Sequence, residues 1–357
     1  MKRLILIATF LLLTFSLSAC SGSFAPTSWP GLSLDPAGET AFLAYQNQVY
    51  AVDAATGSLK WKYPSEPDRK RTFFAPPVYT PSGELLVGGY DNILVSLDPA
   101  LGTENWIFDA GSRIVGAPLA TEEAIYLPTA GGDLFALDLE GHPIWDAPFH
   151  SEKDLWAPPV LDNGVLYVGG MDHNLYALDA SDGSIRWQTP LGGAINSAPL
   201  LHDGVLYLGT FAQQVVAVDA EIGTILWDVS TDGWVWATPQ TANGLLYVGD
   251  VSGAFYALDM DDGSLAWQSV PDGPIVSQAL IGEDTVYFTT ESGTLYAVDA
   301  AKGSPVWEYS VEKGKLYTAP QAVDGDILIA PTGGDSLLIA VDAETGTQRW
   351  QFTPEKK

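Results

Sequence analysis

Cysteine is almost absent from this chain of 357 residues, and clusters of reactive side chains are absent with it. The one cysteine, Cys20, has no partner, which excludes a disulfide within the chain. The histidines stand in separate expected loops, none paired at the spacing of zinc ligands: His142, His150, His173 and His202. No nucleophile elbow, phosphate-binding loop or catalytic triad is recognisable. These absences argue against most hydrolases, phosphotransferases and zinc enzymes.

Basic residues are also scarce. The chain has 16 Lys and Arg against 44 Asp and Glu, a formal net charge of −28. Such an acidic surface repels nucleic acid and anionic lipid headgroups, so we expect no nucleic-acid partner. Hydrophobic residues make up 46% of the chain, and no helix-period run, linker or low-complexity tract interrupts its middle. We therefore predict one large domain.

A long hydrophobic run occurs only at the N-terminus. Leu4 to Leu17 follows Lys2 and Arg3 and is short for a membrane span, as in a signal peptide. The next residues, Ser18-Ala19-Cys20, complete a segment that resembles the lipobox of bacterial lipoproteins. The resemblance implies that residues 1–19 are removed, that Cys20 carries lipid and that residues 20–28 form a tether. The alternative is an ordinary secretory signal with an incidental cysteine.

The location follows from the same segment. A lipid at Cys20 would hold the chain outside the cytoplasm, attached to a membrane by lipid and not by charge. In a cell with two membranes, the non-acidic Ser21 resembles the signal for the outer membrane, and in a cell with one membrane it indicates nothing. We expect anchoring at the periplasmic side of an outer membrane or, failing that, at the outer face of the cell membrane.

One motif recurs along the chain: an apolar run ends in Asp, a Gly follows, and then a Trp. The Asp positions are Asp53, Asp98, Asp138, Asp179, Asp219, Asp259, Asp299 and Asp342. The Trp positions are Trp61, Trp106, Trp145, Trp187, Trp227, Trp267, Trp307 and Trp350. The copies are 40 to 45 residues apart, which is the period of a propeller blade. We predict an all-β fold over residues 29–353, an eight-bladed β-propeller of four-stranded antiparallel blades.

The copy from Leu175 to Trp187 explains the motif physically. Asp179 ends a strand, and its carboxylate can accept local backbone N–H groups in an Asx-type turn. Gly183 stands where the hairpin loop needs a positive φ. Trp187 returns on the next strand, and one Trp per blade can fill the gap between neighbouring blades. We therefore assign the repeated Asp, Gly and Trp to the fold and not to a binding site.

Four strands are expected per copy. In the fourth copy they are Ala157–Leu161, Val165–Gly170, Leu175–Asp179 and Ser184–Gln188. Proline recurs in the first strand, which suits an innermost edge that needs fewer N–H groups. The first copy begins in phase at Trp29–Leu32 and the last ends at Thr347–Phe352, which predicts eight whole blades. A closing strand from Phe24–Ser28 remains an alternative.

The tandem AxDxxxGxxxW motif resembles the pyrroloquinoline-quinone-type (PQQ-like) propeller repeat, over residues 29 to 352. That repeat occurs in quinoprotein dehydrogenases, in sensor domains and in BamB-like envelope lipoproteins, so it indicates the fold more than the function. The dehydrogenases carry a vicinal cysteine pair, a calcium site, a catalytic Asp and long inserted loops. This chain has one cysteine and short loops. We expect no enzyme activity and no cofactor.

Two polar groups are weak candidates for a cation site. His150, Glu152 and Asp154 form a local cluster for which a solvated loop is the simpler interpretation. A second set falls in turns between second and third strands: Asp250, Glu291 and Asp335. The repeat makes acidic turn residues common, and we predict no metal.

The departures from the repeat are the candidate functional surface. Segments that lead into the first strands vary, and they should gather at one mouth of the ring. They carry the candidate residues Phe73, Phe74, Arg113, Trp156, Trp234, Trp236 and Tyr317, with a basic rim of Arg69, Lys70 and Arg71. The longest such segments are Ser65–Thr72 and Pro148–Asp154. These aromatics either cap the core or form a contact surface, since aromatics and Arg are enriched at interface cores.

Three functions remain open. The first is a monomeric, non-catalytic scaffold, BamB-like, which holds other envelope proteins and is attached to the membrane through its N-terminal lipid. The second is a small-molecule-binding or sensor lipoprotein that uses the aromatic mouth. The third is a quinone-dependent dehydrogenase.

Overall fold

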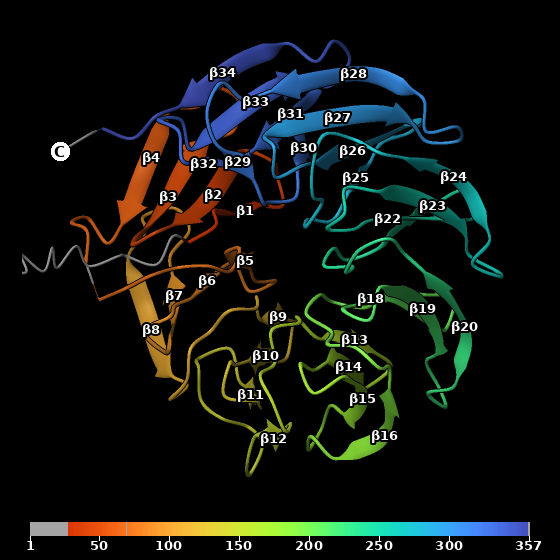
Figure 1. The fold of residues 1–357 in the computed structure, drawn as a ribbon. Coiled ribbons are helices and arrows are strands. Elements are labelled where there is room, and N and C mark those ends of the chain that lie inside the picture. The colour runs from red at the N-terminus through yellow and green to blue at the C-terminus, as the bar shows by residue number, and fades with distance from the viewer. Residues whose placement is uncertain (1–27, 69, 356–357) are drawn as a thin grey trace, which may run out of the picture.

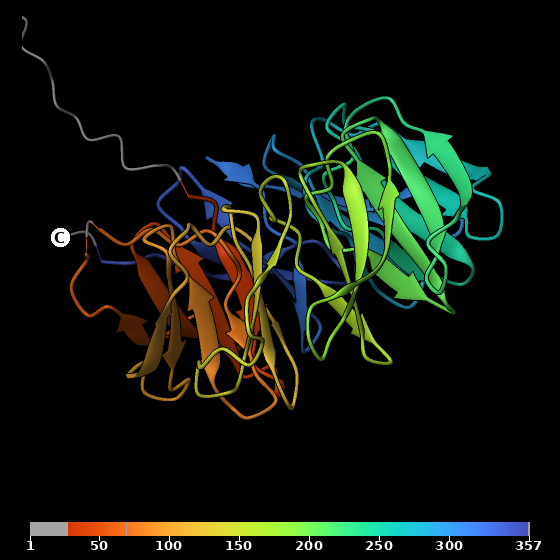
Figure 2. The same ribbon diagram turned by 90° about the horizontal axis from the view of Figure 1, so that it is seen from below.

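Eight four-stranded antiparallel sheets stand around a common centre in the computed structural model, which describes residues 28–68 and 70–355. Figure 1 looks down this ring and shows the innermost strands facing its centre, while Figure 2 shows the blades from the side. The predicted all-β, eight-bladed propeller is confirmed. The segments predicted as signal peptide and lipidated tether lie almost wholly outside the described residues. None of the described residues forms a helix long and apolar enough to span a membrane.

The strands follow chain order within each blade. The first four blades are β1 (Gly31–Leu34), β2 (Thr40–Tyr45), β3 (Gln48–Asp53) and β4 (Leu59–Tyr63); β5 (Val78–Tyr79), β6 (Leu85–Gly88), β7 (Ile93–Leu97) and β8 (Glu104–Asp109); β9 (Leu119–Ala120), β10 (Ile125–Pro128), β11 (Asp133–Leu137) and β12 (Phe149–His150); β13 (Val160–Asp162), β14 (Val165–Gly169), β15 (Asn174–Asp179) and β16 (Ile185–Pro190).

The other four blades are β17 (Leu200–His202), β18 (Val205–Thr210), β19 (Gln214–Asp219) and β20 (Ile225–Ser230); β21 (Gln240–Ala242), β22 (Leu245–Gly249), β23 (Phe255–Asp259) and β24 (Leu265–Ser269); β25 (Leu280–Ile281), β26 (Thr285–Thr289), β27 (Thr294–Asp299) and β28 (Pro305–Ser310); β30 (Gln321–Val323), β31 (Asp326–Ile329), β33 (Leu338–Asp342) and β34 (Gln348–Phe352). A two-stranded ribbon, β29 (Lys315–Leu316) with β32 (Pro331–Thr332), is added beside the eighth blade.

The hairpin geometry follows the sequence. The β13–β14 turn is the pair Asn163-Gly164, with φ of 46° and 76°, as a two-residue hairpin of the Asn-Gly kind requires. Asp179 accepts the N–H of Gly183 on its backbone oxygen, and its own N–H donates to Ser184, each at 2.8 Å. The innermost strand β13 begins at Val160, later than expected, because Pro158 and Pro159 have no N–H to donate.

The core lies between the blades: the described residues form eight apolar clusters, one at each seam between neighbouring blades. The motif Trp residues bridge these seams. The indole N–H of Trp227 donates to the Met260 carbonyl of the next blade at 3.0 Å, and the hydroxyl of Tyr207 donates to the same oxygen at 3.3 Å. The indole also covers the next blade's motif glycine, Gly263, where an added Cβ would lie 2.8 Å from the ring. The same indole hydrogen bond joins each of the first seven blades to the next.

Within residues 28–355, the first and last blades close the ring side by side, and neither exchanges a strand with the other (Figure 1); the alternative closing strand Phe24–Ser28 lies almost wholly outside the described residues. Leu32, Leu43 and Phe352 share one core cluster, and Tyr45 bonds Thr332 through their hydroxyls at 3.1 Å. Trp350 covers Gly57, but its indole N–H has no partner among the described residues. The closing seam therefore has the packing of the other seams without their hydrogen bond.

The third blade departs most from the predicted pattern. Its outermost strand β12 is only Phe149–His150, part of the segment Pro148–Asp154 that the sequence placed at the mouth. His150 does not join Glu152 and Asp154: its Nδ1 lies 2.8 Å from Asp133 Oδ1 on the neighbouring strand β11. The prolines Pro143 and Pro148, which lack N–H donors, leave few residues able to continue a regular outer strand.

Candidate functional site at the mouth of the ring

The segments leading into the innermost strands, here called lead-in segments, are held between two turns. Met171 in the β14–β15 turn donates its N–H to Asp154 at 3.0 Å, and Leu155 donates to Thr129 in the preceding blade at 2.9 Å. The same pair of bonds recurs from blade to blade, for example from Val251 to Trp234 and from Ile275 to Asp250. The lead-in segments and these turns thus form one face of the ring, and their backbone is fixed.

One side chain per blade occupies an equivalent place on this face. Strand registers pair Val160 with Tyr167 in the fourth blade and Ser33 with Phe42 in the first. The residue four places earlier is Trp156 in one and Trp29 in the other. We call this the mouth position, and its eight members are Trp29, Phe74, Val115, Trp156, Asn196, Trp236, Val276 and Tyr317. Five of the eight members are aromatic.

A continuous run of aromatic rings crosses the mouth. Trp29 stacks on Tyr317 with ring centroids 5.1 Å apart and meets Trp236 edge-on at 5.7 Å. Phe211 continues the run, 5.3 Å from Trp236 and 5.2 Å from Trp234, on which it stacks. The first and sixth blades are not neighbours, so this run connects parts of the ring that strand pairing does not. Trp234, at its end, is 48% exposed.

A second aromatic group lies over the second and third blades. Phe74 stacks on Tyr90 at 4.0 Å, and the Arg113 guanidinium sits 5.3 Å from the Tyr90 ring, within cation–π range. Trp156 has no ring neighbour of this kind among the described residues, and its indole N–H donates to Asp154 at 3.1 Å. The structure therefore brings most of the predicted mouth residues onto one face, in two groups plus Trp156.

Phe73 does not lie on the mouth face with the other predicted residues. Its side chain is 1% exposed and lies in the core between the first two blades. Its predicted place on a contact surface is therefore wrong, and the physical reason is its position next to the mouth: each lead-in segment first buries one apolar residue, as Ile114, Leu155 and Val235 do. Phe73 fills that buried place.

The basic rim is smaller than the sequence suggested. Arg69 lies outside the described residues, and Lys70 is exposed. Arg71 forms ion pairs with Asp91 at 3.7 Å and Glu104 at 3.6 Å and also bonds the Tyr63 hydroxyl. Burial raises the pKa of Asp91, an effect that Arg71 opposes. Arg71 therefore stabilises the seam beside the mouth and is not a free cation for a partner.

The acidic turn residues that the sequence set across the ring have protein partners. Asp250 is fully buried and accepts hydrogen bonds from the Tyr256 hydroxyl at 2.9 Å and the Gly233 N–H at 2.7 Å. Burial raises the pKa of Tyr256, and the bond to Asp250 raises it further. Glu291 bonds Lys315 at 3.2 Å. These carboxylates hold the lead-in segments in place through their contacts with Gly233 and Lys315.

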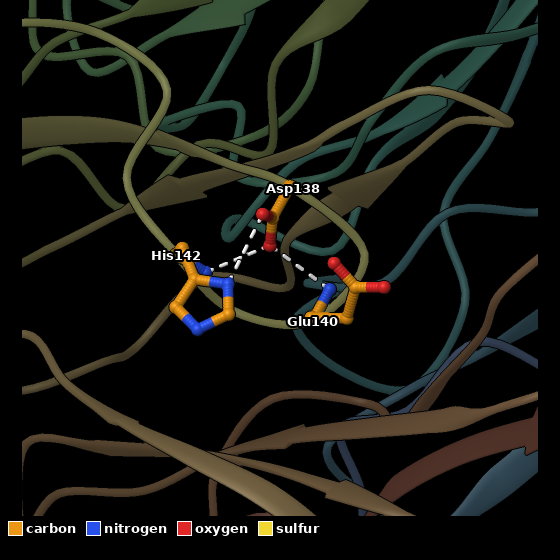
Figure 3. Close-up of side chains that lie close together, drawn as sticks. All are labelled: Asp138, Glu140 and His142. Atoms are coloured by element: carbon orange, nitrogen blue, oxygen red, sulfur yellow. Dashed lines mark hydrogen bonds and ion pairs between the residues drawn. The ribbon is translucent and has the colours of Figure 1, made fainter.

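One group of side chains has the composition of a cation site. Asp138, Glu140 and His142 bring ligand atoms within 4.8 Å of one another in the shortened turn of the third blade (Figure 3). Asp138 Oδ1 accepts the N–H groups of Glu140 and His142 at 2.9 and 2.8 Å, and Oδ2 lies 3.1 Å from His142 Nδ1. The group is an exposed Asx turn whose carboxylate is used locally, and it stands apart from the mouth.

Sequence reasoning missed three residues of the mouth. Trp29 was assigned to the first strand. The strand register shows that Ser33 is the equivalent of Val160, so Trp29, four residues earlier, lies in the lead-in segment. Tyr90 and Phe211 stand in the turns that follow the second strands, where other blades have Ala130 or Val251. An aligned comparison of the eight turns would have found both, because they break the repeat there.

Comparisons with known proteins identify relatives over most of the ring. A family model described as outer membrane protein assembly factor BamB matches residues 46–153, 139–233, 202–281 and 270–357. The outer membrane protein assembly factor BamB of Nitrosomonas eutropha is 35% identical over 111 residues, which are 31% of this chain and 26% of that protein. The chain thus matches only about a quarter of this curated relative's length.

Two solved structures are similar in fold. The crystal structure of BamB from Moraxella catarrhalis has a TM-score of 0.69 and 18% identity, covering 84% of this chain and 91% of that one. The computationally designed Ika8 protein has a TM-score of 0.72 and 14% identity, covering 91% of this chain and 96% of that one. At such low sequence identities the similarity shows the fold alone. The designed protein has this fold as well.

Proposed function

The chain belongs to the family of the outer membrane protein assembly factor BamB, and from this premise we propose that it is a non-catalytic scaffold in the assembly of outer-membrane proteins. The observation that carries the proposal is the family match, which runs through the ring from residue 46 to residue 357. A ring of eight blades with short loops suits a scaffold, because it presents a face whose backbone is fixed. No step of chemistry is part of the proposal.

The proposed location is the periplasmic side of the outer membrane. A lipid on Cys20 would hold the ring there, and several acyl chains anchor a protein more firmly than one. The residues from 20 to 28 would give the ring some distance from the bilayer. We propose that the ring works as a monomer, with its partners among envelope proteins.

The proposed contact surface is the outer part of the mouth, around Trp234, Phe211 and Trp156. Trp234 is nearly half exposed although the blades do not need it: the neighbouring blades have Ala194 and Pro274 at the equivalent position, where their carbonyls accept the same backbone hydrogen bond. Large aromatic side chains on a rigid face are the usual anchors of protein interfaces. Lys70 and Arg113 stand on the same face and would steer an acidic partner.

Binding of envelope proteins by single-residue variants tests this surface. Trp234→Ala should weaken capture of the partner by about 2 kcal/mol, the cost of losing an interface anchor, while the melting temperature stays nearly unchanged. Leu265→Ala is the matched control, since Leu265 is similarly exposed on an outer strand away from the mouth. If wild type and Trp234→Ala bind the partner equally well, the mouth is not the contact surface.

A further inference from the structure

A hollow of about 410 Å³ opens beside the aromatic run, between the first, second, seventh and eighth blades. Trp29, Phe74 and Tyr317 line it, each from a mouth position, together with Gln278 and Gln321. Its volume lies in the range of small-ligand sites. The scaffold function proposed above does not require such a site.

The charge of the hollow differs from that of the molecule. The chain carries 44 acidic residues, yet all the described residues that line the hollow are neutral. The cation beside it, Lys315, lies 5.6 Å from the Tyr317 ring and is paired with Glu291. An ionic ligand would therefore find no counter-charge in the lining, and a neutral ligand is favoured.

Free polar groups are distributed among the aromatic rings. The Ser33 hydroxyl oxygen is buried and has no hydrogen-bond partner among the described residues. The side-chain amides of Gln278 and Gln321 have no partner there either, and each offers both donors and an acceptor. A ligand rich in hydroxyl groups would satisfy both amides.

The backbone around the hollow does not suit a peptide. An extended peptide binds by adding a strand to an open edge, which needs N–H and C=O groups in alternation. Pro30 and Pro76 line the hollow, and a proline has no N–H. The Thr318 hydroxyl is already bonded to the Pro30 carbonyl, so that acceptor is also engaged. Side chains, and not a strand edge, must provide the recognition.

We propose that this hollow binds a neutral oligosaccharide. Sugar rings present apolar C–H faces that pack on aromatic rings, and their hydroxyl groups both donate and accept hydrogen bonds. Trp29 and Phe74 are held in place for such packing, because each already stacks on a neighbour, Tyr317 and Tyr90 respectively. Gln278 and Gln321 supply the polar contacts. This chemistry matches the lining in charge, in aromatic surface and in free polar groups.

Titration of the intact ring with defined trisaccharides tests the proposal. Chitotriose and maltotriose serve as neutral probes, sialyllactose as an anionic probe, and a neutral peptide rich in Phe and Pro as the rival ligand. Saturation-transfer NMR and calorimetry should give saturable binding of a neutral trisaccharide with a Kd on the order of 1 mM or tighter. Sialyllactose and the peptide should bind far more weakly.

Variants locate the binding. Trp29→Ala and Gln278→Ala should each weaken the affinity by about tenfold, equivalent to about 1.4 kcal/mol, while Trp234→Ala leaves it unchanged. Gln278 is exposed, so Gln278→Ala should keep the fold. Its affinity therefore tests the proposal even if Trp29→Ala lowers the melting temperature. The proposal is overturned if neither neutral sugar saturates the protein, or if Gln278→Ala binds the sugar as tightly as wild type. It is also overturned if the protein prefers the peptide. The scaffold function fails separately, in the Trp234→Ala experiment.

Discussion

The motif glycine of each blade meets two separate demands. Gly223 has a φ of +72°, which the hairpin loop requires and which any other residue adopts only with strain. It also lies beneath the indole of Trp187 in the preceding blade, where an added Cβ would come within 2.6 Å of the ring. The first demand is visible in the sequence as turn chemistry. The second is visible only when neighbouring blades are placed side by side.

Two glycine variants separate these demands. Gly204 has nearly the same conformation as Gly223, with φ of +77°, but an added Cβ would meet nothing within 4 Å. Gly204→Ala should therefore cost only the conformational strain, about 1 kcal/mol of unfolding free energy. Gly223→Ala should cost at least about 3 kcal/mol, because the indole must also move. If chemical denaturation shows that both variants lose the same unfolding free energy, the indole moves aside at no cost and the second demand is absent.

The motif aspartates predict how stability depends on pH. Asp179 accepts hydrogen bonds from the Ser181 hydroxyl, the Ser181 N–H and Arg186, and these lower its pKa to about 2. In the unfolded chain the pKa is about 3.9. The folded state binds the proton less tightly, so the stabilisation is fully present above about pH 4 and is lost as the pH falls to about 2.

Asp179→Asn tests this linkage. The variant should melt at a lower temperature than wild type at pH 7, and the difference should shrink toward pH 2, where wild-type Asp179 is also protonated. Asp146→Asn is the control, because Asp146 is exposed and makes no hydrogen bond among the described residues. A constant difference between wild type and Asp179→Asn at both pH values would contradict the account.

At the scale of elements, the seams between blades are not all equal. From the first blade to the seventh, the motif Trp donates its indole N–H to a carbonyl of the next blade, as Trp61 does to Pro99 at 2.8 Å. Trp350 at the closing seam makes no such bond among the described residues. The contacts of Tyr45 with Thr332 and of Thr318 with Pro30 reinforce this seam instead.

Trp227→Ala and Trp350→Ala compare an internal seam with the closing one. Trp227→Ala should lower the unfolding free energy by about 3 kcal/mol, since it deletes a large packed side chain and removes one of the two side-chain hydrogen bonds to the Met260 carbonyl. Trp350→Ala should cost about 1 kcal/mol less, because it removes packing alone. Chemical denaturation measures both. A greater loss in Trp350→Ala would mean that the closing seam limits the stability of the ring.

The strands were largely predictable, and their ends were not. The period of the motif and the alternation of residues such as Tyr176 and Ala177 determine the blades, their number and their order. The innermost strands are shorter than predicted because of proline, and β12 in the third blade lies nearer the C-terminus than the motif implied. The ribbon of β29 with β32 arises from a longer turn in the last blade, which the repeat does not describe.

At the scale of the whole molecule, the repeat builds the ring and its departures form the mouth. Sequence comparison among the copies was enough to gather Trp156, Trp234 and Trp236 on one face. It could not show that Trp29 reaches Trp236 from a blade that is not its neighbour, because that contact depends on the closure of the ring. It also could not separate the buried Phe73 from the partly exposed Phe74.

The most direct test of the scaffold function is the amount of folded β-barrel protein in the outer membrane of cells depleted of this chain. The folded fraction can be read from the difference in gel mobility between unheated and heated membranes. We predict that depletion lowers this fraction, that the wild-type gene restores it, and that Cys20→Ala, which lacks the proposed lipid site, does not. An unchanged folded fraction in the depleted cells would contradict the proposed role in outer-membrane protein assembly.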